Sequence, residues 1–262
     1  MHAVSWTSPH VQAAFQHFGH DRKCESCHAP SPVFLTGLDN PVEFRRDGHE
    51  RGVDCISCHL GPNGRVMGRQ TINDAPCRPI ASKELQSSAQ CAGCHVAIHD
   101  DWLDSSFATT GKTCQSCHMP AVTERTGGFS HLVLGGHDDE TVRAAARLTC
   151  QIEGNELVVT VTNQGAGHNF PGERHNRVLL VELFEYSSDG EIVLGRQHVI
   201  KDITPFRGES STEEIRAGGN VTVRFPIVEG AHNGGVRLLY KRFPWIADRD
   251  ALVVHRQEVS FN

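Results

Sequence analysis

Eight of the ten cysteines in this 262-residue chain belong to four copies of one short pattern, Cys-x-x-Cys-His. Two thiols and an imidazole at this spacing can serve as disulfide partners, redox dithiols, zinc ligands or attachment points for haem. All four copies lie between residues 24 and 118. In chain order they are Cys24/Cys27/His28, Cys55/Cys58/His59, Cys91/Cys94/His95 and Cys114/Cys117/His118.

The histidine after each second cysteine decides between these alternatives. A zinc knuckle does not dictate that residue, and with 17 histidines in the chain four such neighbours are not expected by chance. A thioredoxin-like dithiol needs one motif at a strand-to-helix turn, not four along loops. Cys-x-x-Cys-His is the pattern of c-type haem attachment, in which both thiols bond to haem vinyl groups and the histidine reaches the iron. The sequence therefore predicts four haem c groups, each with its motif histidine as the proximal iron ligand.

The opposite face of each iron determines what a haem can do. A second strong ligand gives a six-coordinate centre suited to electron transfer, whereas an open face permits catalysis. Thirteen histidines remain once the four motif histidines are subtracted from 17. The candidate distal ligands among them are His10, His49, His131, His137 and His168.

Position along the chain favours these five. His49 lies six residues before Cys55, so a short loop can aim it at a neighbouring haem, and His10 follows a Trp-x-Ser-Pro element. His131 and His137 bracket the flexible run Leu-Val-Leu-Gly-Gly.

His168 lies in a glycine-rich connection, 163–171, between two expected strands. Glycine permits close backbone approach, so this loop could place His168 against a haem and join the two halves of the chain. His17, His20 and His99 are weaker candidates. The histidines expected to be ordinary surface or strand residues are His2, His175, His198, His232 and His255.

Residues 1–138 hold every motif and are rich in glycine, proline, histidine and serine. They show no sustained strand alternation, and only short helical patches are expected, at 10–17 and 82–90. Aromatic residues make up only 6% of the chain, a small supply for a large core. We therefore predict a mostly irregular, short-helical tetrahaem domain over 1–138 in which the porphyrins themselves form the core.

Residues 139–262 have a different character. Runs rich in valine, leucine, isoleucine, threonine and phenylalanine alternate in part and are separated by glycine, asparagine, aspartate and serine turns. Seven short strands of this kind predict an all-β, immunoglobulin-like sandwich. Pro226 is expected at an edge or at a strand end. The expected strands are 145–152, 157–162, 177–186, 192–200, 221–227, 236–240 and 252–261.

The remaining cysteines, Cys77 and Cys150, lie outside the motifs. In an exported chain they could form a disulfide that ties the segment between the second and third motifs to the first strand. Two free thiols are the alternative.

Charge and hydropathy exclude several classes of protein. The formal net charge is -6 and there is no basic stripe, which argues against a nucleic-acid partner. No run approaches the 18 or more apolar residues of a membrane span. The opening residues MHAVSWTSPH lack the apolar region of a signal peptide, so an export signal is expected to have been removed or to lie upstream.

Residues 1–138 resemble the multihaem c-type cytochromes related to the tetrahaem cytochrome c554 group. The resemblance rests on the Trp/Ser/His elements, on His-x-x-Gly-Val-x-Cys-x-x-Cys-His from His49 to His59, and on Cys-x-x-Cys-His-Met-Pro ending at Pro120. The whole chain looks like the multihaem cytochromes with a C-terminal β-sandwich after a Gly-His-x-x-Pro loop, here 167–171. This resemblance implies an exported bacterial or archaeal electron carrier, periplasmic or extracellular, with stacked, mostly bis-histidine haems. Some tetrahaem relatives polymerise into extracellular filaments in which a histidine of one subunit ligates a haem of the next.

Three functions follow from the motifs and the resemblance. The first is electron transfer through four haems in extracytoplasmic respiration, with redox proteins or extracellular acceptors as partners. The second is a reductase or oxidase of a small nitrogen or sulfur compound at one open haem, although the chain has no Cys-x-x-Cys-Lys variant and its two tyrosines, Tyr186 and Tyr240, fall in expected strands. The third is a self-associating nanowire subunit, in which His10 or His17 ligates a neighbour's haem.

Overall fold

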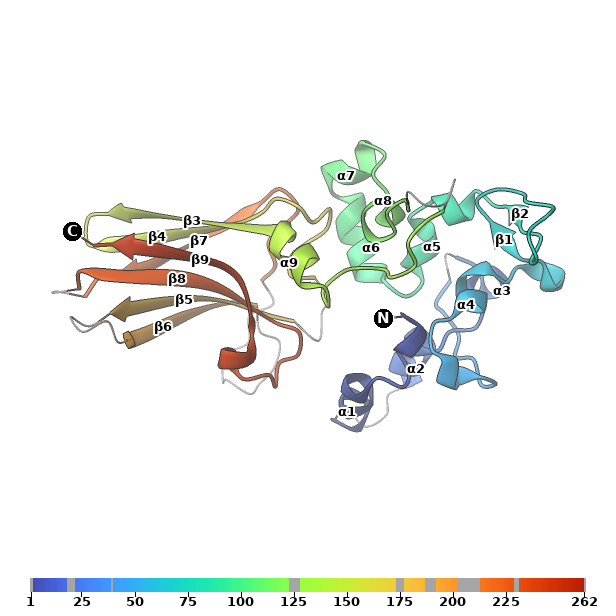
Figure 1. The fold of residues 1–262 in the computed structure, drawn as a ribbon, viewed down its shortest axis with the longest axis horizontal. Helices are drawn as coiled ribbons and strands as arrows, with labels where there is room; N and C mark the ends of the chain where they lie inside the picture. Colours follow the sequence, from blue (N-terminus) through green and yellow to red (C-terminus); the bar gives the residue numbers. More distant parts are fainter. Residues whose placement is uncertain are drawn as a thin grey trace. The chain divides into compact units, whose positions relative to one another are not determined.

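The structure is a computed structural model that describes residues 2–17, 22–38, 40–122, 128–172, 177–186, 192–201, 213–228 and 231–261. The chain divides into two compact units. Figure 1 colours the ribbon by residue number, so the segments of each unit can be followed in it. The first unit comprises Met1–His99 and Thr110–Leu134, and the second comprises Asp100–Thr109 and Gly135–Asn262. The chain therefore passes into the second unit, returns to the first, and enters the second again.

Short helices dominate the first unit, as the sequence predicts. The expected helix at 10–17 is confirmed, but 82–90 is helical only over Glu84–Gln86 and from Ala89 onward. A two-residue parallel pair, β1 with β2, is the regular sheet that the described part of this unit contains. The elements are η1 (His2–Val4), α1 (Pro9–His17), α2 (Arg22–His28), α3 (Val33–Thr36), η2 (His49–Arg51), α4 (Cys55–His59), η3 (Pro62–Gly64), β1 (Met67–Gly68), β2 (Ile80–Ala81), η4 (Glu84–Gln86), α5 (Ala89–Ala92) and α8 (Cys114–His118).

The first unit has very little apolar core of its own. Its short helices have no long apolar stripe to pack together, and the described part of the unit buries few hydrophobic side chains. Apart from prolines, the buried hydrophobic residues there are Phe15, Ala29, Val33, Val42 and Leu85. Because burial of apolar surface is the main driving force of folding, this polypeptide needs an additional apolar component to form a stable unit.

The second unit is built on strands, and all seven expected strands are confirmed to within three residues at each end. A short helix, α9 (Asp139–Ala145), precedes them, and it was not expected from the sequence. Two further helices contribute to the 100–109 segment: α6 (Val96–Leu103) ends in it and α7 (Ser106–Thr109) lies within it. The strands are β3 (Ala146–Glu153), β4 (Glu156–Asn163), β5 (Val178–Tyr186), β6 (Ile192–Lys201), β7 (Asn220–Pro226), β8 (Asn233–Lys241) and β9 (Leu252–Ser260).

These strands form two antiparallel sheets, with the orders β3-β4-β7 and β6-β5-β8-β9 (Figure 1). Alternate residues of β4 and β5, such as Val159, Val161, Val181 and Leu183, lie in one buried cluster that draws on both sheets. Each fully buried aliphatic side chain of this kind contributes roughly 1.5–3 kcal/mol. As expected, Pro226 ends a strand, and that strand lies at the edge of its sheet.

Within the part of the chain that the structure describes, no helix has the length and apolar character needed to cross a membrane.

Candidate haem sites

Each Cys-x-x-Cys-His motif adopts about one turn of helix. The second and fourth motifs coincide with α4 and α8, and the first lies at the end of α2. The third begins in α5, and its turn is completed by a bond from the His95 amide to the Cys91 carbonyl, 3.0 Å long. Residues i, i+3 and i+4 share one face of a helix, so the two thiols and the imidazole of a motif lie on the same side. This is the arrangement that covalent haem attachment requires.

The predicted attachment cysteines differ in how far the polypeptide covers them. Cys55 and Cys117 are exposed. The Ser116 hydroxyl lies 3.9 Å from the Cys117 sulfur. The other six, which are half-buried, are Cys24, Cys27, Cys58, Cys91, Cys94 and Cys114.

Exposure does not remove Cys55 or Cys117 from the candidate site. A thioether forms only if a vinyl group can reach the sulfur, and an uncovered thiol on the same face as its motif partners can be reached. All eight cysteines therefore stay predicted attachment points, and at Cys55 and Cys117 any cover would have to come from the porphyrin, because the polypeptide does not supply it.

Two motif turns begin at a capping side chain directly before the first cysteine. Asp54 accepts a bond from the Ser57 amide, and Thr113 accepts one from the Ser116 amide, both 3.3 Å long. Such caps satisfy backbone donors that a helix leaves unpaired at its start. The sequence therefore fixes where these two turns start.

Asp54 is itself held by a buried cation. Arg45, whose side chain is 8% exposed, donates to the Asp54 carboxylate at 2.9 Å and to the Gly52 carbonyl at 2.9 Å. Burial by itself raises the pKa of Asp54, but hydrogen bonds and charge from Arg45, with bonds from Ser57, outweigh it and leave the pKa below its ordinary value. The Asp54 carboxylate is therefore ionised at neutral pH and holds the second motif in place.

Several histidines are oriented by the backbone in the way that metal ligands are. In each, Nδ1 lies against a backbone carbonyl, and because a carbonyl can only accept, Nδ1 carries the proton. Nε2 is then left with its lone pair for a metal ion. The pairs are His49 with Arg46 (2.8 Å), His59 with Met67 (2.8 Å), His131 with Phe129 (2.9 Å), His168 with Asn169 (2.8 Å) and His118 with Leu134.

Two motif histidines face a second imidazole. The ring centroids of His59 and His131 lie 6.0 Å apart, and those of His95 and His2 lie 6.2 Å apart. Two imidazoles on opposite sides of one metal ion, with metal–nitrogen distances of about 2.0 Å, have centroids about 6.3 Å apart. The spacing of both pairs therefore fits a single iron between the rings.

His2 is the site residue that sequence reasoning missed. Its backbone carbonyl accepts bonds from the Ser5 and Val53 amides, both 3.0 Å long, and the Ser5 hydroxyl donates to the His28 carbonyl at 2.7 Å. These contacts dock the N-terminal segment on the first and second motifs and bring His2 to the third. Burial first, and then the nearby His95, lower the pKa of His2 to about 4. The imidazole is therefore neutral at neutral pH, as a metal ligand must be. No local sequence signal marks this residue, because the contacts that place it are all tertiary.

The other proposed distal ligands lie in different surroundings. The His49 ring packs edge-on against Trp6, with centroids 5.0 Å apart, while His10 is exposed on α1. His137 differs from the anchored histidines, because its Nε2 lies 3.3 Å from the Arg177 guanidinium and accepts from it. Since Nδ1 of His131 and of His49 is anchored on a backbone carbonyl, whereas Nε2 of His137 accepts from Arg177, the geometry favours the first two over His137 as ligands.

The remaining histidines differ in their surroundings. His198 and His232 are exposed, and His255 donates through Nε2 to the Ala146 carbonyl at 2.6 Å. His20, His175 and the side chain of His17 lie outside the described residues.

The loop that carries His168 is held by the fully buried Asn163. Its amide donates to the His168 carbonyl at 2.8 Å, and its Oδ1 accepts from the Ala166 amide at 3.1 Å. A Cβ on Gly167 would lie 2.9 Å from the Phe107 ring, so glycine is required where this loop packs against α7. This loop therefore makes a close backbone approach to the 100–109 segment, and an approach of His168 to a haem stays a prediction.

Cysteines of different motifs are neighbours. The Cys27 thiol lies 4.0 Å from the Cys94 carbonyl, and Cys91 is hydrogen-bonded to Cys114. That bond lowers the pKa of the free Cys114 thiol to about 6 and raises the pKa of Cys91. The first, third and fourth motifs are thus packed close together.

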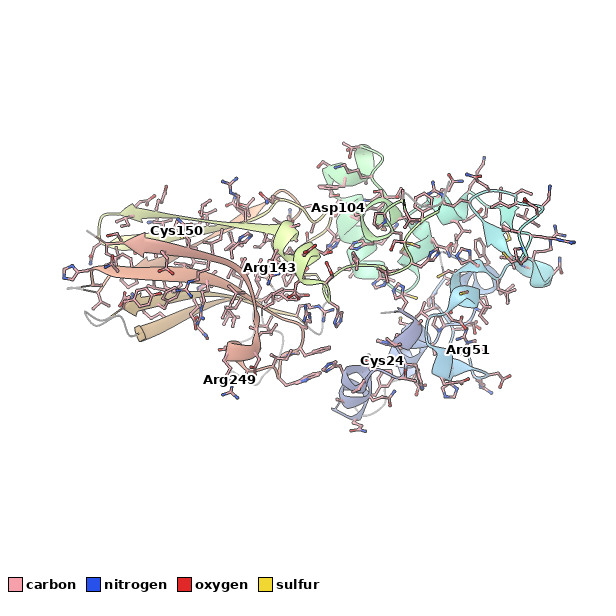
Figure 2. All side chains as sticks on the ribbon, in the orientation of Figure 1. Cys24, Arg51, Asp104, Arg143, Cys150 and Arg249 are labelled. Carbon is pink, nitrogen blue, oxygen red and sulfur yellow. The ribbon has the colours of Figure 1, made fainter. Side chains whose placement is uncertain are left out.

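Cys77 and Cys150 both have free thiols in this structure, and they belong to different units, so a disulfide between them stays a prediction. Cys77 is exposed, whereas Cys150 is half-buried on β3 (Figure 2). Burial raises the pKa of Cys150 to about 11, so its thiol is protonated at neutral pH.

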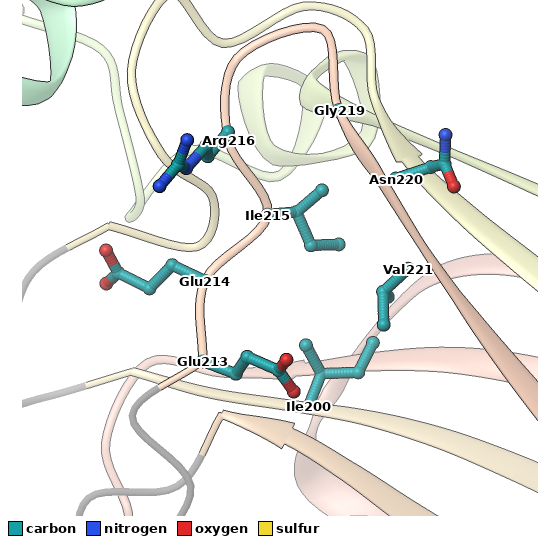
Figure 3. A pocket seen from close by; sticks show the side chains of 8 residues that line it. All are labelled: Ile200, Glu213, Glu214, Ile215, Arg216, Gly219, Asn220 and Val221. Atoms are coloured by element: carbon teal, nitrogen blue, oxygen red, sulfur yellow. The ribbon is translucent and has the colours of Figure 1, made fainter.

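A hollow of about 260 Å³ lies in the second unit (Figure 3). It is lined by Ile200, Ile215, Val221, two glutamates and an arginine, together with Gly219 and Asn220. Since this lining includes no cysteine or histidine, it offers none of the ligands that haem binding needs.

Among solved structures, the chain matches a penta-heme cytochrome c552 from Thermochromatium tepidum with a TM-score of 0.69. The alignment covers 100% of this chain and 94% of that one, at 17% identity. The chain has the fold of a multihaem c-type cytochrome. Matches to a putative beta-galactosidase from Bacteroides fragilis (11% identity, 45% of this chain and 16% of that one, TM-score 0.25) and to a beta-glucuronidase (12% identity, 44% and 11%, TM-score 0.21) are too weak to carry an argument. No family model and no curated protein matches the sequence.

The multihaem cytochrome fold and the motif geometry agree on the type of cofactor. The comparison protein is named for five haems, whereas this chain has four Cys-x-x-Cys-His motifs. The number four therefore stays a prediction from the motifs.

Proposed function

We propose that this protein transfers electrons through four haem c groups, attached at the four motifs and mostly ligated by two histidines each. The observation that carries the proposal is the pairing of His59 with His131 and of His95 with His2 at the spacing of a single metal ion. When bound, the haem irons supply one-electron chemistry. The chain's own contribution would be a second imidazole, from His131 or His2, near the motif histidines His59 and His95, which would leave no room for a substrate between the rings of each pair.

Hydrogen bonds to the ligands support the same function. A backbone carbonyl on Nδ1 fixes the ring orientation and makes the imidazole a more basic ligand. His59, His118 and His131 have this anchor. Basic ligands stabilise the oxidised iron, so we expect low reduction potentials.

Haem also completes the fold of the motif-bearing region. With so few buried hydrophobic side chains in the first unit, the porphyrins are its main apolar component, as proposed for the tetrahaem domain at 1–138. A core shared by two antiparallel sheets supports an immunoglobulin-like sandwich at 139–262.

Covalent haem attachment fits an extracytoplasmic carrier, periplasmic or extracellular, that exchanges electrons with redox proteins or extracellular acceptors. Membership of the cytochrome c554 group remains a prediction from the sequence. So do the filament subunit and the open-haem reductase, since no contact within the described residues favours either.

The proposal is tested by the holoprotein's haem content and spin state. We expect haem to stay attached in denaturant and acid, the intact mass to show four added haems, and the electron paramagnetic resonance (EPR) spectrum of the oxidised protein to be low-spin. Loss of the chromophore on denaturation would contradict covalent attachment. A large high-spin fraction, with carbon monoxide binding after reduction, would instead favour an open-haem enzyme.

A further inference from the structure

The segment around β1 contacts His59 of one histidine pair directly and its partner His131 through Phe129. The Met67 carbonyl, in β1, accepts the Nδ1 proton of His59 at 2.8 Å. Two residues later, the Arg69 guanidinium lies 4.0 Å from the centre of the Phe129 ring. The Phe129 carbonyl in turn accepts the Nδ1 proton of His131 at 2.9 Å. Residues 67–69 therefore contact the His59 imidazole directly and are linked to the His131 imidazole through Phe129.

Backbone pairing fixes the segments on both sides of this arrangement. On the β1 side, Met67 pairs with Ile80 of β2. The Met67 side chain also packs closely on Gly61, where a Cβ would lie 2.7 Å from it. On the other side, Phe129 is bridged to Ala121. The Arg69–Phe129 stack thus joins two segments that are each fixed by their own backbone contacts.

We propose that Arg69 is a positioning residue for His131, acting through its cation–π contact with Phe129. This inference rests on the proposed function, in which His131 and His59 ligate the same iron. The guanidinium packs on the Phe129 ring and so restrains that residue, whose carbonyl sets the direction of the His131 ring. Arg69 also places a positive charge beside this pair, which favours the reduced form of an iron bound there.

The arginine is suited to this role by its shape. A planar guanidinium stacks on an aromatic face, whereas a lysine ammonium is a compact, strongly hydrated charge that stacks less well. Lysine at this position therefore keeps the charge but weakens the orientation, and the two effects of Arg69 can be separated.

The test uses the full haem-loaded protein with Arg69→Ala, Arg69→Lys and Phe129→Leu, and with Arg65→Ala as the matched control. Arg65 is an exposed arginine in the same segment. We expect Arg69→Ala and Phe129→Leu each to give a high-spin signal of up to about one haem in four, with matching carbon monoxide binding after reduction. Arg69→Ala should also shift one haem to a more negative potential, and Arg69→Lys should largely preserve that potential. Arg65→Ala should leave the spectra unchanged.

A His131→Ala variant separates failure of this inference from failure of the proposed function. If His131→Ala opens one haem while Arg69→Ala and Phe129→Leu behave like Arg65→Ala, the positioning role is overturned and the ligand assignment stands. If His131→Ala leaves all haems six-coordinate, the ligand assignment and the positioning role both fall. If the protein carries no covalent haem, the proposed function itself is wrong.

Discussion

The orientation of a histidine that binds a metal ion is set by the hydrogen bond of its other ring nitrogen. In this chain, the motif histidines His59 and His118 and the more distant His131 have Nδ1 on a backbone carbonyl. The sequence alone identifies the motif histidines, because their spacing from the cysteines is fixed. It ranks the others only by nearby residues, and for that reason His2 was assigned to the surface.

Replacing His2 tests the assignment that the structure adds. We expect His2→Ala to convert one haem to a high-spin, carbon monoxide-binding form, because the second imidazole facing His95 is removed. The exposed His232, replaced by alanine, is the control and should change nothing. EPR of the oxidised proteins provides the measurement, and an unchanged low-spin spectrum in His2→Ala would rule out this ligand.

Asp54 predicts a dependence of stability on pH. Its pKa in the folded protein lies below the ordinary value of 3.8, so the ionised carboxylate stabilises the fold at all pH values well above 3.8. This contribution is lost as the pH falls from about 3.8 through the lower, folded pKa. Urea unfolding of the haem-loaded protein as a function of pH should show it.

Asp54→Ala should lower the free energy of unfolding at pH 7 by roughly 1–3 kcal/mol, because Arg45 and the start of α4 lose their partner. It should also flatten the pH dependence below about pH 4. Glu50→Ala, at an exposed position in the same region, is the comparison variant. Equal midpoints for the two variants would show that the Arg45–Asp54 pair is unimportant.

At the scale of elements, the sequence predicts the strands, which have a regular apolar pattern, but not the helices of only one or two turns. The strands were found because their apolar residues recur over five or more positions, as in Val178–Tyr186. Helix α9 is not among the predicted elements, although Asp138 accepts from the Thr141 amide at 2.9 Å and acidic residues lie in its first turn. Those residues are a helix-start signal that could have been used. The partner of the His168 loop could not be read, because Phe107 is far from it in sequence.

The His168 loop offers a test at this scale. We expect Gly167→Ala to destabilise the second unit by about 1–3 kcal/mol, since the new methyl group overlaps the Phe107 ring. Gly195 is the control, because a Cβ there meets nothing within 4 Å. Urea unfolding followed by β-sheet circular dichroism gives the comparison. If Gly167→Ala and Gly195→Ala unfold at the same concentration, the loop does not need its glycine.

At the scale of the whole molecule, the two units differ in what holds them together. The second has a buried cluster drawn from two sheets, whereas the described part of the first has few buried hydrophobic residues. Composition allowed this contrast to be predicted, because the low aromatic content and the glycine- and proline-rich motif region left little material for a core.

In the 262-residue chain made without haem attachment, the second unit should therefore be folded and the first unit should not. We expect it to keep the circular dichroism of β-sheet and a cooperative unfolding transition from the second unit, while amides of the first unit exchange rapidly with solvent. Hydrogen exchange read by mass spectrometry resolves the two regions. Strong protection of the motif segments in the haem-free chain would show that this part folds without its cofactor.

The assignment of Asp100–Thr109 to the second unit has a practical consequence for dissecting the molecule. A cut at the 134–135 junction, by truncation of the gene or by a protease, leaves this decapeptide on the N-terminal fragment. The C-terminal fragment then lacks Phe107, against which Gly167 packs, and Asp101, to which Asn169 donates at 2.9 Å. A C-terminal fragment that is to be studied alone should have this decapeptide grafted back, and it should be less stable without it.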